Sequence, residues 1–372
     1  MIDILIVGGG LVGYSLARAL KDTGLSIHLV EARQSAEDRR PIALSLGSQR
    51  IFDAMGAWEG IAPHATPIRE VHVSEQGGFG TSRLQARSFG LEALGYVVPA
   101  HAIHQALTRD LRVEIHQPAH LRALSRGRES MKAILSQGTN LEAKLVVGAD
   151  GGDSSLRRML AIPARERYFG QSALVGTLLP TLPHRHTAFE RFTPHGPIAL
   201  LPLPEGRCGF VWCTPHGESL LSLGEGELLR RFQEAFGWHL GRFRAIRALG
   251  CYPLRTIRAL HQNRDRAVLL GNAAHTLHPV AAQGFNLALR DVHTLAGMIK
   301  AGDLRHPHLL KRYAEAREPD QRRTIALTEG LLRLFSNASL SLKVARNLGL
   351  LAFDLLPPAK RRLMRLGMGL QL

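Results

Sequence analysis

Cysteine is scarce in this sequence, with three residues in 372, and no two of them form a Cys-x-x-Cys pair. The sequence therefore predicts neither a disulfide framework nor a cysteine-ligated zinc site, and it favours a reducing compartment. Long apolar runs are missing as well, because none approaches the roughly 20 residues that a transmembrane helix needs. The first residues already read as a strand carrying Asp3, so we expect no cleaved signal peptide.

Aromatic residues are also few, at 6%, whereas basic residues exceed acidic ones and give a formal net charge of +16. A nucleic-acid partner is not expected, because the sequence shows no nucleic-acid-binding motif and little interleaving of aromatic and basic residues. Anionic cofactors and anionic lipid headgroups suit the charge better. With 45% hydrophobic and 21% charged residues, the chain has the composition of a folded protein with a substantial core.

Histidine is plentiful, with 18 residues, but its spacing predicts no metal site. His184 and His186, like His101 and His104, lack the nearby Asp, Glu or Cys residues that would complete a ligand set. No nucleophile is paired with a base, so acyl transfer is not expected either.

A glycine-rich turn lies between two predicted strands, at 3–7 and 26–30, with a helix after the turn. Its G-x-G-x-x-G glycines are Gly8, Gly10 and Gly13. The first permits the turn, the second lets a pyrophosphate approach the backbone, and the third lets the helix pack on the strand. Glu31, at the end of the second strand, is placed to accept hydrogen bonds from an adenosine ribose. The sequence thus predicts a dinucleotide site.

Another predicted strand, at 268–270, ends at a tight turn, and a helix follows from Gly284 to about Ile299. Pro279 and Gly284 leave the N-terminus of this helix uncovered by side chains. The helix dipole favours a partial negative charge there. A flat redox-active ring that becomes anionic on reduction would be stabilised at this position.

A strand predicted over 145–147 runs into a Gly-x-Asp-Gly turn that contains Asp150. Alone, this is an ordinary strand-to-helix turn with an Asp cap. Together with the two segments above, it resembles the flavoprotein aromatic hydroxylases, FAD monooxygenases related to para-hydroxybenzoate hydroxylase. In that family the first segment holds the ADP part of FAD. The Asp-Gly segment lies near the pyrophosphate and the nicotinamide donor, and the last segment holds the ribityl chain and the flavin ring.

Further stretches are similar to the ubiquinone-biosynthesis hydroxylases within this family. They are residues 40–45, 271–287, 290–292, 317–320 and 346–350. Most of that group has Asp where this chain has Asn272, which resembles the branch acting on 2-polyprenyl-6-methoxyphenol. An Asn carbonyl can still accept a hydrogen bond from a ribityl hydroxyl but brings no charge, so FAD binding should survive.

The resemblance implies that FAD is bound without a covalent link. The expected cofactor-binding residues are Gly8, Gly10, Leu11, Val12, Gly13, Glu31, Ala32, Arg40, Gln105, Asp150, Gly271, Asn272, Pro279, Gly284, Phe285 and Asn286. Gln105 could equally be a plain helix-surface residue. No catalytic residue is assigned, and the candidates near the flavin are His275, His278 and Pro279. The two histidines could tune the ring or touch the substrate, or they could orient the loop.

The fold expected from the resemblance is α/β, with a Rossmann-like FAD-binding domain of the glutathione-reductase type, an interleaved β-sheet substrate domain and a helical C-terminal tail. The FAD-binding domain is predicted over 1–70, 95–168 and 251–330. The substrate domain is predicted over 71–94 and 169–250, and the tail over 331–372.

The implied activity is hydroxylation of the ring of a polyprenylated phenol in ubiquinone biosynthesis. NADPH or NADH would serve as transient electron donor, and dioxygen would react through a flavin hydroperoxide. Two alternatives stay open: a flavin-dependent reductase or dehydrogenase of a prenyl lipid, and a non-catalytic flavoprotein subunit of a membrane-associated biosynthetic complex. Other ubiquinone-biosynthesis proteins are therefore candidate partners.

The end of the chain is basic and apolar, with seven Lys or Arg residues and one acid between Gly330 and Leu372. Such helices can lie on an anionic membrane, and we expect Leu363 and Leu366 to enter the headgroup region beside the basic residues from Lys360 to Arg365. The alternative is that the tail packs on the protein. The expected location is cytoplasmic, peripherally associated with the inner membrane.

Overall fold

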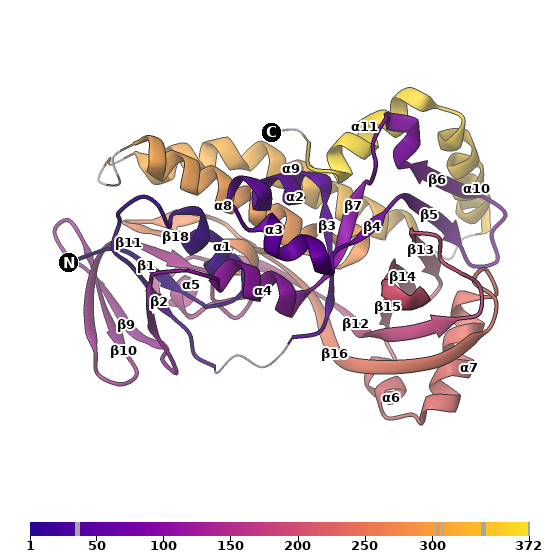
Figure 1. The fold of residues 1–372 in the computed structure, drawn as a ribbon, viewed down its shortest axis with the longest axis horizontal. Helices are drawn as coiled ribbons and strands as arrows, with labels where there is room; N and C mark the ends of the chain where they lie inside the picture. The colour runs from indigo at the N-terminus through magenta and orange to yellow at the C-terminus, as the bar shows by residue number, and fades with distance from the viewer. Residues whose placement is uncertain (34–37, 303, 305, 307, 336–339, 371–372) are drawn as a thin grey trace.

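The computed structural model describes residues 1–372 apart from 34–37, 303, 305, 307, 336–339 and 371–372. Two large β-sheets stand at opposite ends of an elongated molecule, and long helices run along it (Figure 1). This architecture confirms the predicted α/β fold with a second sheet and a helical C-terminal region. None of the described helices has the length and apolar character needed to span a bilayer.

The first sheet has a parallel core in the order β18-β11-β1-β2-β8, as in nucleotide-binding folds. The parallel strands are β1 (Ile2–Val7), β2 (Ile27–Val30), β8 (Glu114–His116), β11 (Asn140–Gly148) and β18 (Ala267–Leu269), and the antiparallel additions are β9 (Leu121–Arg126), β10 (Met131–Leu135) and β17 (Asn263–Arg264). Because side chains alternate along a strand, Ile4 and Ile6 enter one hydrophobic core while Leu5 and Val7 enter another. Burial on both faces explains the apolar run from Ile4 to Val7 in β1.

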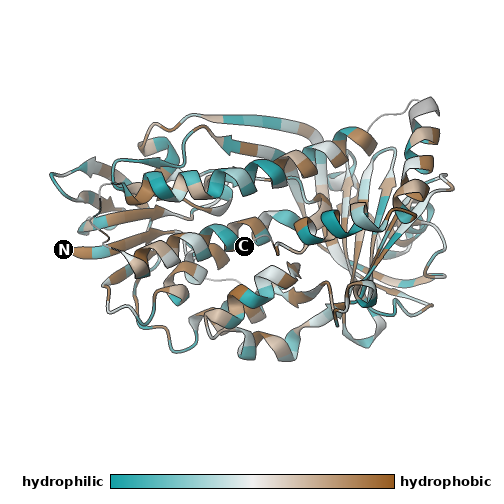
Figure 2. Ribbon diagram, turned by 90° about the horizontal axis from the view of Figure 1, so that it is seen from above, coloured by the Kyte–Doolittle hydropathy of each residue, from teal (hydrophilic) through white to brown (hydrophobic). Residues whose placement is uncertain are grey.

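Helices cover one face of this sheet and continue along the molecule. They are α1 (Leu11–Ala19), α2 (Leu46–Ala54), α3 (Trp58–Ile61), α4 (Ala100–Thr108), α8 (Gln283–Ala301) and α9 (Leu309–Phe335), whereas α5 (Ser155–Met159) packs against β9. Figure 2 shows hydrophilic and hydrophobic residues mixed along the helices, as expected of helices with one face on a core.

The second sheet has the order β19-β16-β12-β15-β14-β13-β5-β6. Its strands are β5 (Glu70–Glu75), β6 (Thr81–Gln85), β12 (Ala164–Pro180), β13 (Thr187–Thr193), β14 (Gly196–Pro202), β15 (Cys208–Thr214), β16 (Phe243–Ala259) and β19 (His275–Thr276), and α6 (Gly217–Leu221) and α7 (Glu225–Phe236) pack on it. The strands β12 and β16 pair from Ala164 with Ala259 to Pro180 with Phe243. The predicted boundaries at 168/169 and 250/251 fall inside these strands, which run unbroken between the two ends of the molecule.

A small third sheet, of β3 (Pro41–Ser45), β4 (Thr66–Ile68) and β7 (Gly95–Pro99), lies between the two large ones. The C-terminal helices α10 (Leu340–Asp354) and α11 (Pro357–Gly367) come next to the second sheet, where α10 packs on β6. Asn347 Oδ1 accepts a hydrogen bond from Gly80 N at 2.7 Å, and Asp354 Oδ1 accepts one from Ser82 Oγ at 3.1 Å. The tail is therefore docked on the protein.

This docking corrects two expectations for the tail. Leu363 is half-buried and lines a cavity between the tail and the rest of the protein. Lys360 forms an ion pair with Asp354 at 2.5 Å and donates a hydrogen bond to the carbonyl of Arg83. The amphipathic pattern correctly predicted that apolar residues of α11 share one helix face, but this face packs toward the second sheet. Residues 336–339 and 371–372 of the predicted tail lie outside the described part of the chain.

Candidate active site

The glycine turn between β1 and α1 can be built only from glycine at two of its positions. Gly8 has a φ of +112°, and a Cβ on it would lie 2.4 Å from the carbonyl oxygen of Ala149. A Cβ on Gly13 would lie 2.0 Å from the carbonyl oxygen of Gly8. Gly10 differs, because a Cβ there would meet nothing within 4 Å and its φ of −79° suits any residue. The space beside Gly10 is thus open to a ligand.

Glu31 lies beside this turn, directly after β2. Its Oε2 accepts a hydrogen bond from Gly9 N at 2.6 Å, and its Oε1 accepts one from Arg33 N at 2.9 Å. Each carboxylate oxygen keeps a second lone pair for a ribose hydroxyl. The neighbouring Ala32 is exposed. The structure thus brings the turn and the predicted ribose acceptor together.

Asp150 comes directly after Ala149, the residue whose carbonyl lies against Gly8. Its Oδ2 accepts hydrogen bonds from Ser155 Oγ at 2.9 Å and Leu156 N at 3.1 Å, which caps α5. Its Oδ1 is buried and has no hydrogen-bond partner among the described residues. Leaving a buried carboxylate oxygen unpaired is costly, so this atom is suited to a donor group on a ligand.

The turn after β18 packs closely on α1. Gly271 has a φ of +55°, and a Cβ on it would lie 3.0 Å from a methyl group of Val12. Leu11 packs on the same core as Val12. Asn272 is exposed, and its side chain makes no hydrogen bond within the described residues. Its amide is therefore free to bind a ligand.

The two candidate histidines have different surroundings. His275 is buried, and its Nε2 lies 2.6 Å from Asp291 on α8. Burial alone would raise the pKa of Asp291, but His275 and the Arg317 guanidinium outweigh it and hold that pKa at about 2. This contact ties the loop to α8, and the role of His275 stays a prediction.

His278 lies in the segment that leads into α8. Its Nδ1 accepts a hydrogen bond from Val280 N at 3.2 Å, and its ring packs edge-on against Phe169. Burial lowers the pKa of His278 to about 4, so the ring is neutral at physiological pH. Just beyond Pro279, Ala281 and Ala282 have φ values of 58° and 49°, a strained conformation for non-glycine residues.

The start of α8 is anchored by Asn286. Its Oδ1 accepts hydrogen bonds from Ser45 N and Ser48 Oγ, and its Nδ2 donates to the carbonyls of Ala43 and Ala282. All its side-chain hydrogen-bonding directions are therefore used within the protein. Phe285 packs near Phe52, while a Cβ on Gly284 would meet nothing within 4 Å.

Two other expected cofactor contacts lie at the surface. Arg40 pairs with Asp38 at 2.6 Å, and its guanidinium stands 5.3 Å from the centre of the Tyr252 ring. Gln105 is exposed on α4, which suits either of the roles considered for it.

A cavity of about 610 Å³ extends from this region toward the C-terminal helices. It begins at β3 and the first turn of α8, runs past β5 and β13, and is bordered by α9, α10 and α11. Its lining is mostly apolar and includes Val73, Phe192, Val280, Phe335, Leu350, Phe353, Leu363 and Met364. Glu190 of β13 also lines the cavity, and burial raises the pKa of this carboxyl to about 8. Its side chain makes no hydrogen bond or ion pair within the described residues.

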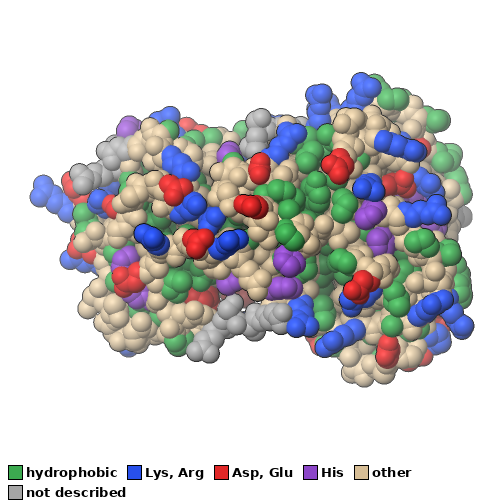
Figure 3. All heavy atoms as spheres, in the orientation of Figure 1, with side chains coloured by type: hydrophobic (Ala, Val, Ile, Leu, Met, Phe, Trp, Pro, Cys, Tyr) green, Lys and Arg blue, Asp and Glu red, His purple; other side chains and the backbone are tan. Residues whose placement is uncertain are grey.

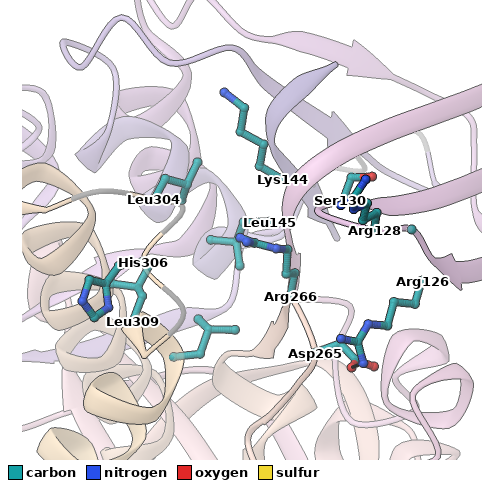
Figure 4. Close-up of a pocket in the computed structure, with 12 residues that line it drawn as sticks. Arg126, Arg128, Ser130, Lys144, Leu145, Asp265, Arg266, Leu304, His306 and Leu309 are labelled. Carbon is teal, nitrogen blue, oxygen red and sulfur yellow. Dashed lines mark hydrogen bonds and ion pairs between the residues drawn. The ribbon is translucent and has the colours of Figure 1, made fainter.

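A second cavity, of about 220 Å³, lies at the far end of the first sheet (Figure 4). Its basic lining residues are Arg126, Arg128, Lys144 and Arg266. Asp265 pairs with Arg126 at 2.7 Å, and Asp3 pairs with Lys144 at 2.5 Å. Its volume is below the roughly 300–1,000 Å³ usual for ligand pockets. It is therefore a poorer candidate for the substrate than the large apolar cavity.

The family model described as "FAD binding domain" matches residues 1–328. The chain belongs to this FAD-binding family. The ubiquinone hydroxylase UbiL of Rhodospirillum rubrum is 37% identical over 99% of this chain and 89% of its own length. The 3-demethoxyubiquinol 3-hydroxylase of Escherichia coli is 30% identical over 99% of this chain and 98% of its own.

A solved structure, the p-nitrophenol 4-monooxygenase PnpA of Pseudomonas putida, has a TM-score of 0.82. The match covers 98% of this chain and 96% of the PnpA chain at 17% identity, so it supports the fold. The family and its hydroxylase relatives make this FAD-binding protein an FAD-dependent monooxygenase, as the sequence predicted.

The residues present fit FAD. The space beside Gly10, the unpaired Oδ1 of Asp150 and the carboxylate of Glu31 offer places for a pyrophosphate, a hydroxyl donor and a ribose. The individual cofactor contacts stay predictions. Sequence reasoning did not single out Glu190, because a lone acid in an apolar strand shows no motif, and only the pairing of β13 with β5 places it on the cavity wall.

Proposed function

We propose that this monooxygenase hydroxylates the ring of a polyprenylated phenol in ubiquinone biosynthesis, with NADH or NADPH as electron donor and dioxygen as co-substrate. The observation that carries the proposal is the large apolar cavity between the first turn of α8 and the C-terminal helices. A prenylated phenol is mostly hydrocarbon, and an apolar lining suits it. The names of the Rhodospirillum rubrum and Escherichia coli relatives support the same substrate class.

FAD held beside Gly10, Asp150 and Glu31 would supply the redox chemistry, in which electrons come from the nicotinamide, one oxygen atom of dioxygen enters the electron-rich ring and the other leaves as water. The residues of the chain position the substrate and shield the site from water. The uncovered amides at the start of α8 stabilise a neighbouring partial negative charge, and the apolar walls exclude water. The neutral His278 adds no positive charge there.

The cavity gives the substrate an orientation. We place the phenol head beside Ser45 and Gln283, at the end near α8, and the prenyl chain along Phe335, Leu350 and Phe353. Glu190 is protonated below its pKa of about 8 and can donate a hydrogen bond to a ring oxygen.

The outer surface of the tail offers a route from the membrane. Leu348, Leu351, Leu355 and Leu356 are exposed, with Leu355 at 81%. Basic side chains lie among apolar ones at this end of the molecule (Figure 3). Exposed apolar residues with cations nearby are suited to reversible contact with an anionic bilayer, where a prenylated substrate resides. We therefore place the enzyme on the cytoplasmic membrane surface.

The test is product analysis with purified, FAD-loaded protein, NADPH or NADH, a candidate prenylphenol and ¹⁸O₂. The proposal expects a product that gains one ¹⁸O atom. Turnover of the lipid without ¹⁸O incorporation would favour a reductase or dehydrogenase. A protein that holds FAD but never oxidises NAD(P)H with any prenylphenol would favour a non-catalytic subunit.

A further inference from the structure

Three potential metal ligands meet at the edge of the first sheet, away from the large cavity. His28 lies on β2, and Glu114 and His116 lie on the neighbouring edge strand β8. His28 is paired with Glu114 in the parallel register, and His116 follows two residues later. Because residues two apart share a face, the backbone places all three side chains on one side of the sheet.

The ligand atoms are already close together, all within 4.8 Å of one another. His28 Nδ1 lies 3.1 Å from His116 Nε2. Glu114 carboxylate oxygens lie 3.4 Å from His28 Nε2 and 3.5 Å from His116 Nε2. Tetrahedral zinc with bonds of about 2.0–2.2 Å separates its ligand atoms by about 3.3–3.6 Å. The contact to His116 uses Nδ1 of His28, whereas the contact to Glu114 uses its Nε2. A set of one ligand atom per residue lies within 4.8 Å, somewhat wider than the spacing that a bound ion requires.

We propose that His28, Glu114 and His116 bind one divalent transition-metal ion of the zinc type, with water at the remaining position. Two imidazoles and one carboxylate form a ligand set that zinc favours. This site is new relative to the FAD and substrate sites, and it does not depend on the function proposed above.

The two rings are held in place before any ion arrives. Their side chains are 15% and 12% exposed, whereas Glu114 is 62% exposed and can adjust to the ion.

The position suggests what the ion would do. The strand β8 has three residues and ends the sheet on this side. Its His116 carbonyl accepts a hydrogen bond from Glu31 N at 3.0 Å, and Ala119 N donates to the Glu31 carbonyl at 2.8 Å. An ion that bridges β2 and β8 would hold the edge strand against the residue placed to bind the adenosine ribose.

Metal binding can be measured by isothermal titration of chelator-treated, FAD-loaded protein with ZnSO₄. We expect the wild type to bind one zinc ion per chain tightly (the tight equivalent). The His28→Gln/His116→Gln double variant should bind zinc at least tenfold more weakly. Glu114→Gln should weaken binding with little effect on folding, since its side chain is mostly exposed. Flavin absorbance and circular dichroism report whether each variant folds.

The matched control is His306→Gln/His308→Gln, which removes an exposed histidine pair whose ring centres lie 5.7 Å apart. It should keep the tight equivalent. The proposal is overturned if the wild type shows no tight equivalent, if Glu114→Gln and the folded double variant bind zinc as tightly as the wild type, or if the control loses binding equally. X-ray absorption of the zinc-loaded wild type should show two imidazole ligands.

Discussion

Arg346 of α10 and Glu75 of β5 form a buried ion pair with their atoms 2.6 Å apart. Asn347 Nδ2 donates to the other Glu75 oxygen at 2.8 Å, so this one carboxylate holds two consecutive residues of the tail. Both charged side chains are less than a tenth exposed. Because Arg346 also lines the large cavity, the contact that docks the tail is part of the cavity wall.

Breaking this pair should release the tail. Arg346→Met leaves Glu75 buried without its cation, a loss of about 3–5 kcal/mol in typical buried pairs. We expect faster amide hydrogen exchange in α10 and α11 and a raised KM for the prenylphenol, with FAD content retained. Arg361→Met, at an exposed tail position, is the control and should leave exchange unchanged. Equal protection of α10 in both variants would contradict the role given to the pair.

Gly10→Val should yield folded protein without FAD. No protein atom lies within 4 Å of a Cβ at this position, so the variant is expected to fold, while the added side chain occupies the space predicted for the pyrophosphate. Flavin absorbance after gel filtration measures the loss, and circular dichroism verifies the fold. Gly13→Ala is the contrasting variant, expected to destabilise the protein itself because its Cβ would lie 2.0 Å from a backbone oxygen. A yellow Gly10→Val protein would show that FAD binds elsewhere.

Glu31→Ala should weaken FAD binding by about 1–3 kcal/mol, or roughly 5- to 150-fold, because the ribose hydroxyls lose a charged acceptor. The change also leaves Gly9 N without its partner at 2.6 Å. Glu31→Gln keeps one acceptor oxygen and should lose less. Fluorescence titration of apoprotein with FAD measures both affinities, and equal values for all three proteins would remove Glu31 from the cofactor site.

The sequence predicted the turn from short-range spacing, and the structure shows that Gly8 and Gly13 leave no room for a side chain and that Glu31 lies beside the turn. Their contacts with FAD stay predictions. The sequence could not locate the substrate side. Glu190 reaches the cavity through strand pairing, and Arg346 through the docking of a helix. Likewise, the resemblance made Asn286 a candidate cofactor contact, and its hydrogen bonds to Ser45 and Ala43, which join distant segments, could not be read from the sequence.

Glu190 should make the folded protein less stable as pH rises. Its pKa is raised from 4.5 to about 8 in the folded state, so the folded protein holds a proton that the unfolded chain releases earlier. The contribution of Glu190 to the free energy of unfolding is therefore fully present below pH 4.5. It declines as the pH rises to about 8, by on the order of a few kcal/mol. Glu190→Gln should remove this decline in urea unfolding at pH 5, 7 and 8.5. Parallel pH profiles for the two proteins would show that Glu190 is ionised in the cavity.

The tail should bind anionic membranes through its outward residues. Arg361, Arg362 and Arg365 of α11 are exposed, whereas Lys360 is paired with Asp354, so we expect these three arginines to meet the headgroups. Replacing them together with Gln should weaken co-sedimentation with anionic liposomes by about 3 kcal/mol, at about 1 kcal/mol per residue. Added salt should likewise weaken the binding of the wild type to anionic liposomes.

The matched control for this membrane prediction replaces Arg112, Arg122 and Arg128 with Gln. These arginines are also exposed but belong to the opposite end of the molecule, around β8 and β9. Because both triple variants lose the same net charge, a difference between them isolates the position of the charge from its amount. Equal losses would mean that the overall charge of +16 drives adsorption with no preferred face. A substrate route through the tail would then lose its support, since the cavity would have no fixed orientation toward the bilayer.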